Sequence, residues 1–180
     1  MSSIIIYGSQ YGTTKKYAEE LSKRTNIQAI SFENVKEIND YNKIIYLGGI
    51  YAGGVLGMSE TLKKLNNISN KTIILATVGL ADPTDEGNIN NIKNNIKKQL
   101  KKEVFEKVKI FHLRGGIDYT RLKFVHKTMM RLLYNAVKNL PDEKKTAEDK
   151  AMIDTYNQKV NFINFSDLDS IIEEIQMNSK

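Results

Sequence analysis

The sequence predicts a three-layer α/β fold, in which a parallel five-stranded sheet carries helices on both faces. Three observations lead to this prediction. Short apolar runs rich in β-branched residues recur along the chain, segments of helical character alternate with them, and the glycines concentrate where the runs end. Continuous apolar runs are typical of strands buried on both faces, and strand–helix alternation is typical of βαβ units with right-handed crossovers.

The elements follow one another regularly along the chain. Strands are predicted at residues 4–7, 26–32, 43–47, 72–77 and 108–113. Helices are predicted at residues 13–24, 58–65, 86–102, 118–137 and 166–177. Apolar side chains gather on one face of the last two helices, as expected for helices packed against a core. The segment 139–154 is rich in charge and is predicted to be the least structured part of the chain.

Composition indicates one soluble domain. The chain has 180 residues, of which 41% are hydrophobic and 27% are charged, and its formal net charge is +6. No apolar run approaches the roughly 20 residues that cross a bilayer. The N-terminus lacks the basic region and cleavable apolar segment of a signal peptide. Because cysteine is absent, disulfides, thiol nucleophiles and iron–sulfur ligands are excluded, and we expect a cytoplasmic protein.

The first predicted strand passes directly into a helix through a polar loop. This loop consists of Ser9, Gln10, Tyr11, Gly12, Thr13 and Thr14. Its three hydroxyls and its backbone N–H groups can surround a phosphate at the positive end of the helix dipole, and Gly12 permits a tight turn there. Neither a Walker loop nor a dinucleotide fingerprint is present, so a nucleoside triphosphate is not expected. A helix capped by Ser or Thr without a ligand is the alternative interpretation.

Two further loops follow strands that end at the same edge of the predicted sheet, where open α/β sheets bind their ligands. The second loop consists of Ile50, Tyr51, Ala52, Gly53 and Gly54, and the third consists of Thr77, Val78, Gly79 and Leu80. Tyr51 can stack on a planar ring. The third loop offers backbone N–H and C=O groups, which suit a heteroaromatic edge bearing both acceptors and donors. An ordinary turn explains the second loop equally well.

The stretch SQYGTT resembles the phosphate loop of the flavodoxin family, in which a hydroxyl residue, two residues, a glycine, one residue and a threonine follow in order. IYAGG and TVGL lie where flavodoxins place the two loops that sandwich the isoalloxazine ring. The resemblance covers nearly the whole chain. It implies a flavodoxin-like sheet of order 2-1-3-4-5 and noncovalent FMN, with the phosphate at residues 9–14 and the ring between residues 50–54 and 77–80.

The resemblance also implies a redox function. An electron-transfer flavodoxin that exchanges electrons with a partner protein is the expected function. The C-terminal half, FHLRGGIDYTRLKFVHKTMMRLL, resembles the branch that contains menaquinone-dependent protoporphyrinogen oxidase. A flavoenzyme of that kind, which passes electrons to a quinone, is therefore the alternative. We find no proton-abstracting residue beside the three loops, so no catalytic residue is assigned and the protein's status as an enzyme stays open.

A basic helical segment and polar insertion at about residues 117–160 extends the single flavodoxin-like domain. Within residues 118–138, lysines and arginines accompany several large apolar side chains. A solvated face above a core-facing stripe is the simpler interpretation, and peripheral contact with an anionic membrane or a propionate-bearing tetrapyrrole is the functional one. Because the sequence contains no nucleic-acid-binding module and no paired His or Cys ligands, we expect neither nucleic-acid binding nor a metal site.

Overall fold

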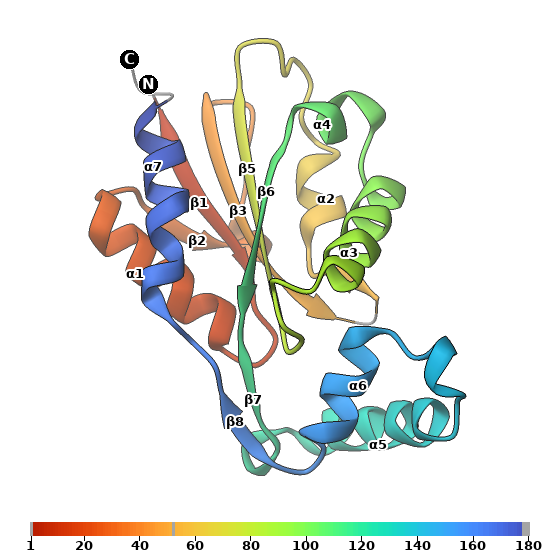
Figure 1. Ribbon diagram of the computed structural model, residues 1–180. Coiled ribbons are helices and arrows are strands. Elements are labelled where there is room, and N and C mark those ends of the chain that lie inside the picture. Colours follow the sequence, from red (N-terminus) through yellow and green to blue (C-terminus); the bar gives the residue numbers. More distant parts are fainter. Residues whose placement is uncertain (1, 52, 178–180) are drawn as a thin grey trace.

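A parallel β-sheet forms the centre of the molecule (Figure 1). The computed structural model describes residues 2–51 and 53–177. The parallel strands in these residues are β1 Ser3–Gly8, β2 Ala29–Ser31, β3 Lys43–Tyr51, β5 Thr72–Gly79 and β6 Lys109–Arg114. They lie in the order β2-β1-β3-β5-β6, and the short β4 (Gly54–Val55) pairs antiparallel with β3. Counting the parallel strands alone, this is the predicted 2-1-3-4-5 order, so the flavodoxin-like fold is confirmed.

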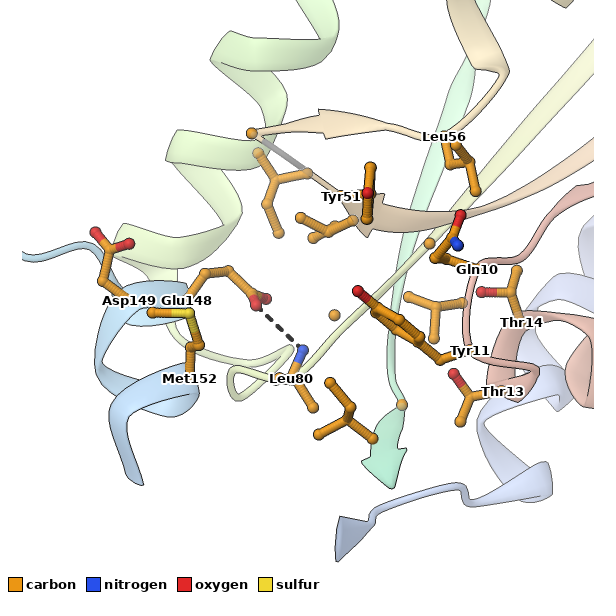
Figure 2. Close-up of a pocket in the computed structure, with 18 of the residues that line it drawn as sticks. Gln10, Tyr11, Thr13, Thr14, Tyr51, Leu56, Leu80, Glu148, Asp149 and Met152 are labelled. Carbon is orange, nitrogen blue, oxygen red and sulfur yellow. Dashed lines mark hydrogen bonds between the residues drawn. The ribbon is translucent and has the colours of Figure 1, made fainter. Parts of the chain in front are cut away.

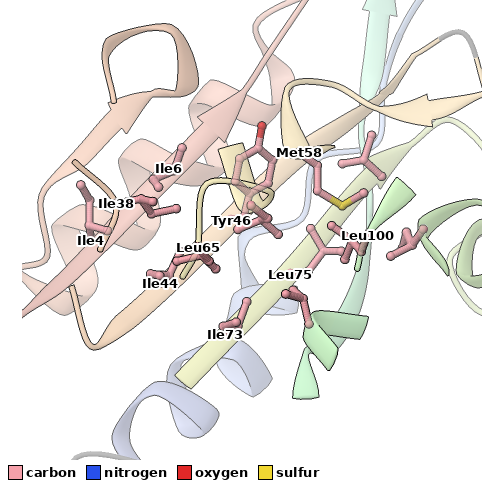
Figure 3. Close-up of a cluster of buried hydrophobic side chains, with 14 of the residues drawn as sticks. Ile4, Ile6, Ile38, Ile44, Tyr46, Met58, Leu65, Ile73, Leu75 and Leu100 are labelled. Atoms are coloured by element: carbon pink, nitrogen blue, oxygen red, sulfur yellow. The ribbon is translucent and has the colours of Figure 1, made fainter. Parts of the chain in front are cut away.

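Alternate residues of the central strands pack on opposite faces of this sheet. In β1, Ile4 and Ile6 belong to the apolar cluster on one face, whereas Ile5 belongs to the cluster on the other face. Ile44 and Ile45 of β3 divide in the same way. Figure 3 shows the first of these clusters. Because successive side chains of a strand point to opposite faces, a sheet covered on both sides requires apolar residues at every position.

The helices divide between the two faces of the sheet (Figure 1). Helices α1 (Thr13–Thr25) and α7 (Asp169–Met177) cover one face and supply buried side chains to its cluster. Helices α2 (Met58–Leu62), α3 (Glu86–Gln99) and α4 (Lys102–Lys107) cover the other face. The result is the predicted three-layer arrangement.

A helical insert, residues 116–161, follows β6 and lies beyond the carboxyl ends of the sheet strands (Figure 1). It begins with β7 (Gly116–Asp118) and ends with β8 (Lys159–Asn161), which pair antiparallel. Between them come η2 Tyr119–Arg121, α5 Phe124–Lys138, η3 Asp142–Lys144 and α6 Ala147–Asp154. The insert has a small apolar cluster of its own. No helix within residues 2–51 and 53–177 is long and apolar enough to cross a membrane.

The structure differs from the sequence prediction at several elements. The helix predicted from residue 118 begins at Phe124, because Asp118 caps a turn instead and accepts the N–H of Thr120 at 3.0 Å. The segment 139–154, predicted to be the least structured part, contains α6, which a reciprocal capping box of Thr146 and Asp149 initiates. The strand predicted at 43–47 continues to Tyr51, because it forms a hairpin with β4.

Several other elements are shorter than predicted. The strand predicted at 26–32 is reduced to β2, because the turn η1 (Phe32–Asn34) follows it directly. The helices predicted at 58–65 and 86–102 end at Leu62 and Gln99. The last helix is preceded by η4 (Phe165–Leu168), and the side chain of Asn164 caps this turn.

Candidate functional site

The first loop brings two backbone donors to one oxygen atom. Oγ of Ser9 accepts the N–H groups of Gly12 and Lys15, each at 3.2 Å. Gly12 has φ of 90°, a left-handed conformation that a residue with a Cβ rarely adopts, and a Cβ placed there would meet no atom within 4 Å. The backbone at Gly12 therefore has open space beside it, and the N-terminus of α1 directs N–H groups at an oxygen, as an anion site requires.

The second loop is the turn of the β3–β4 hairpin. Ile50 pairs with Val55 and Tyr51 with Gly54, and the backbone N–H of Val55 reaches Oε1 of Gln99 on α3 at 3.4 Å. The ring of Tyr51 lies 6.4 Å from the ring of Tyr11, centroid to centroid, at a tilt of 59°. The hairpin therefore fixes Tyr51 beside the first loop.

The residues predicted as the third loop are the last three residues of β5 and the residue after it, and they are held from two sides. Nε of Arg114 donates to the carbonyl oxygen of Leu80 at 3.0 Å, and the N–H of Gly115 donates to the carbonyl oxygen of Gly79 at 2.7 Å. The N–H groups of Leu80 and Ala81 donate to the carboxylate of Glu148 in α6, each at 3.2 Å. The end of β6 thus satisfies the carbonyl groups, and the insert satisfies the N–H groups.

A cavity of about 490 Å³ brings residues of the three loops together (Figure 2). The predicted site residues that line it are Gln10, Tyr11, Thr13, Thr14, Ile50, Tyr51, Gly53, Val78, Gly79 and Leu80. Among the described residues, four predicted ones do not line it: Ser9, Gly12, Gly54 and Thr77. Ala52 lies outside the described residues. The sequence therefore identified the location of the cavity, although not every residue of its wall.

Thr77 has a different place from the one predicted. Its side chain is buried rather than on the cavity wall, and its hydroxyl forms a hydrogen bond of 2.8 Å with Nδ1 of His112. Burial, and secondarily the charge of Lys93, lowers the pKa of His112 to about 4, so this imidazole is neutral at physiological pH. The pair supports the strand ends below the loop rather than facing the cavity.

The insert forms the remaining wall of the cavity, and sequence reasoning missed it. Met129, Met130, Leu133 and Met152 supply an apolar surface, with Glu148 among them. Helix α3 adds the amide side chains Asn88, Asn91 and Asn95. The spacing of Thr146 and Asp149 is a capping-box signal that could have revealed α6. A single glutamate in a charged segment gives no comparable signal for Glu148.

Side chains of α5 also touch the first two loops. Nε2 of Gln10 lies 2.9 Å from Nε2 of His126, and the rings of Tyr11 and His126 meet edge to face, with centroids 6.0 Å apart. The hydroxyl of Tyr51 donates to Sδ of Met129 at 3.2 Å. Burial, together with the neighbouring Tyr51, raises the pKa of Tyr11 to about 12. The insert therefore contacts all three loops.

The wall of the cavity is of mixed chemical character. Its wall combines tyrosine rings, backbone donors and thioether side chains. No cluster of side chains that could hold a metal ion occurs in the part of the chain that the structure describes. Arg114 does not face the cavity as an anion-binding group, because its guanidinium lies over the ring of Phe162, 3.9 Å from the centroid.

Comparison with known proteins adds the following findings. A family described as flavodoxin domain matches residues 4–145, which include all three loops and end before α6. No curated protein matches the chain. Among solved structures, the chain is similar to flavodoxin 1 from Bacillus cereus, at 15% identity over 77% of this chain and 99% of that chain, with a TM-score of 0.42. It is also similar to a putative flavoprotein from Bacteroides uniformis, at 11% identity over 63% and 88%, with a TM-score of 0.43.

Proposed function

We propose that this chain, which belongs to the flavodoxin domain family, binds FMN noncovalently in the cavity and transfers electrons. The observation that carries the proposal is the convergence of three loops at the carboxyl ends of β1, β3 and β5 on one cavity. Ligands of open α/β sheets bind at this edge. The family match includes every residue of these loops.

The backbone N–H groups at the two ends of the proposed site fit the phosphate and the ring of FMN. At the first loop, two N–H groups converge on Oγ of Ser9, an arrangement that also suits a phosphate oxygen. At the third loop, two adjacent N–H groups converge on a carboxylate, an arrangement that also suits the carbonyl edge of a heteroaromatic ring. The phosphate would be held by residues 9–14 without help from a lysine or arginine.

The chain's own contribution is to hold and shield the ring. FMN, when bound, supplies the redox chemistry. Tyr11 and Tyr51 provide aromatic surfaces, and the hairpin and the third loop provide backbone groups. The insert limits the access of water, because its methionine and leucine side chains line the cavity opposite the loops.

A titration of the purified protein with FMN, followed by the loss of flavin fluorescence, tests this proposal. We expect saturable one-to-one binding and a yellow protein. The double variant Gly12→Val, Thr14→Ala should lose the flavin, whereas Thr128→Ala, on the exposed side of α5, should bind as the parent does. Circular dichroism confirms that each variant is folded. A folded parent protein that leaves added FMN free in solution would contradict the proposal.

The apolar wall of the insert favours a second candidate function. An electron carrier needs no substrate pocket, yet Met129, Met130 and Leu133 line the cavity beside the loops. This wall supports a protoporphyrinogen oxidase-like flavoenzyme that passes electrons to a quinone. Anaerobic assays distinguish the two functions: the reduced protein is offered menaquinone or a ferredoxin-type partner, and the oxidised protein is offered protoporphyrinogen. Porphyrin formation coupled to quinone reduction would establish the enzyme, and exchange with the protein partner alone would establish the carrier.

The outer face of α5 supports peripheral contact with an anionic membrane. Phe124 is 84% exposed, Val125 is 72% exposed and Leu132 is 67% exposed. Lys127 and Arg131 lie on the same helix, so that apolar and cationic side chains share one surface. Sedimentation with anionic liposomes tests this contact. We expect binding that Phe124→Ser with Lys127→Glu abolishes, and that neutral liposomes do not reproduce.

A further inference from the structure

Glu148 reaches from the first turn of α6 onto the backbone of the third loop (Figure 2). Its Oε2 accepts the N–H of Leu80 and its Oε1 accepts the N–H of Ala81, each at 3.2 Å. A Cβ added at Gly79 would collide with Oε1, so the carboxylate lies directly against the backbone at the end of β5. Both carboxylate oxygens are thus used on one short stretch of loop.

These two N–H groups are the donors that the proposed ring edge requires. Two adjacent donors bind two adjacent acceptors, whether these are the oxygens of a carboxylate or the carbonyl and nitrogen acceptors of a heterocycle. Each N–H has one proton to donate. A ring edge and Glu148 therefore cannot both be fully bound to Leu80 and Ala81.

The second and third loops also touch each other at Gly79. Cδ1 of Ile50 lies 3.0 Å from the position of a Cβ on Gly79, so the hairpin and the third loop are in contact. Tyr51 and Gln10 are each tied to α5 through Met129 and His126. Glu148 is thus one of several contacts by which the insert closes over the loops.

The two N–H groups, rather than an ion pair, hold the carboxylate of Glu148. Within the described part of the chain, no ion pair joins it to a cation. Burial raises its pKa, the two N–H groups and Arg114 oppose this effect, and the neighbouring Asp149 adds to it. Because burial penalises the charged form, removal of the carboxylate to solvent recovers part of the cost of breaking its hydrogen bonds.

We propose that Glu148 is an internal ligand of the third loop, which FMN must displace in order to bind. This proposal rests on the proposed function, since it concerns the same cavity. The carboxylate satisfies Leu80 and Ala81 while flavin is absent and holds α6 against the sheet edge. Flavin binding releases Glu148 and loosens α6. We call this pair of hydrogen bonds the Glu148 latch; Glu148 itself lies beyond the residues 4–145 that match the family, although most of the insert lies within them.

Two measurements test the latch. The first uses flavin-free protein and compares hydrogen exchange at the amides of Leu80 and Ala81 in the parent, Glu148→Gln and Glu148→Ala. The second measures the Kd for FMN of the same proteins by fluorescence quenching. Asp154→Asn is the matched control, because it removes an exposed carboxylate from the same helix. Glu148→Gln keeps the size of the side chain but retains only one acceptor oxygen.

We expect faster exchange at both amides in Glu148→Ala, and FMN binding that is at least about tenfold tighter than in the parent, which corresponds to about 1.4 kcal/mol. Glu148→Gln should lie between the two, and Asp154→Asn should match the parent. If the parent binds FMN and Glu148→Ala binds it equally or more weakly, Glu148 is not a competitor, and the latch is wrong while the proposed function stands. If neither protein binds FMN, the proposed function fails, and the latch fails with it.

Discussion

At the two ends of the proposed flavin site, the backbone N–H groups are bound by side chains from very different distances along the chain. At the first loop, Ser9 accepts N–H groups that lie three and six residues away. At the third loop, Glu148 accepts N–H groups that lie 68 and 67 residues away. The first end is complete within a single strand–turn–helix unit, whereas the second requires the insert to fold and dock. We infer that the first end belongs to the rigid part of the fold and that the second end can open.

The same contrast exists between the two parts of the molecule. The sheet body, which consists of the parallel strands with α1 to α4 and α7, contains two extensive apolar clusters. The insert contains one small cluster, and much of α5 is exposed. Segments with few buried contacts open at lower free energy than the core. The insert should therefore exchange its amide protons faster than β1, β3 and β5.

The largest effect should come from a core residue of the sheet body. Ile45 is fully buried in β3 between Ile5 and Ile74 of the neighbouring strands. Ile45→Ala should lower the free energy of unfolding by about 2–5 kcal/mol, because it removes buried methyl groups and leaves a cavity. Urea denaturation measures this loss. The whole molecule, insert included, should become less stable.

The matched change in the insert sharpens this comparison. Met152 is 5% exposed and belongs to the small cluster. Met152→Ala should open the insert locally: amide exchange across residues 124–154 accelerates, while the urea midpoint of the sheet body falls by less than half of the Ile45→Ala effect. Equal losses of global stability in the two variants would show that insert and body unfold as one unit, contrary to our account.

The sheet body could be predicted from sequence because its signals are local. Residues 4–7 are apolar at every position, so they identify a strand covered on both faces, and Gly12 marks the turn that follows. The continuation of β3 to Tyr51 could not be read in this way, because it depends on pairing with β4. Glu148 was missed for the same reason. Its role arises only when α6 docks on the third loop, and no nearby residue indicates that contact.

Acid should weaken the sheet body beneath the third loop. The pKa of His112 is lowered to about 4 in the folded protein from the ordinary 6.5, so between these values the unfolded chain binds more protons than the native state. Stability is therefore lost as the pH falls from about 6.5 to about 4, by up to about 3 kcal/mol. His112→Asn, which keeps a partner for Thr77, should abolish this part of the pH dependence. Urea midpoints measured across this range provide the test.

The two smallest expected effects compare the Ser9 side chain at the first loop with the cap of α6 in the insert. Ser9→Ala removes the acceptor of two N–H groups and should cost about 1 kcal/mol of global stability. Thr146→Ala removes the capping box of α6 and also costs about 1 kcal/mol. This second loss should appear as faster exchange across residues 147–154, with little change in the global urea midpoint. If Ser9→Ala changed only local exchange while Thr146→Ala lowered the global urea midpoint, the insert rather than the first loop would belong to the rigid part of the fold.

An amide chemical-shift titration of isotope-labelled protein with FMN tests the central claim most directly. We predict saturable shifts at both ends of the proposed site: at Gly12 in the first loop and Lys15 directly after it, and at Leu80 in the third loop and Ala81 directly after it. The amide of Ile45, in the middle of the sheet, should serve as an unaffected reference. Saturable shifts confined to the outer face of α5, or no shifts at an excess of FMN over protein, would contradict the claim that these three loops form a flavin site.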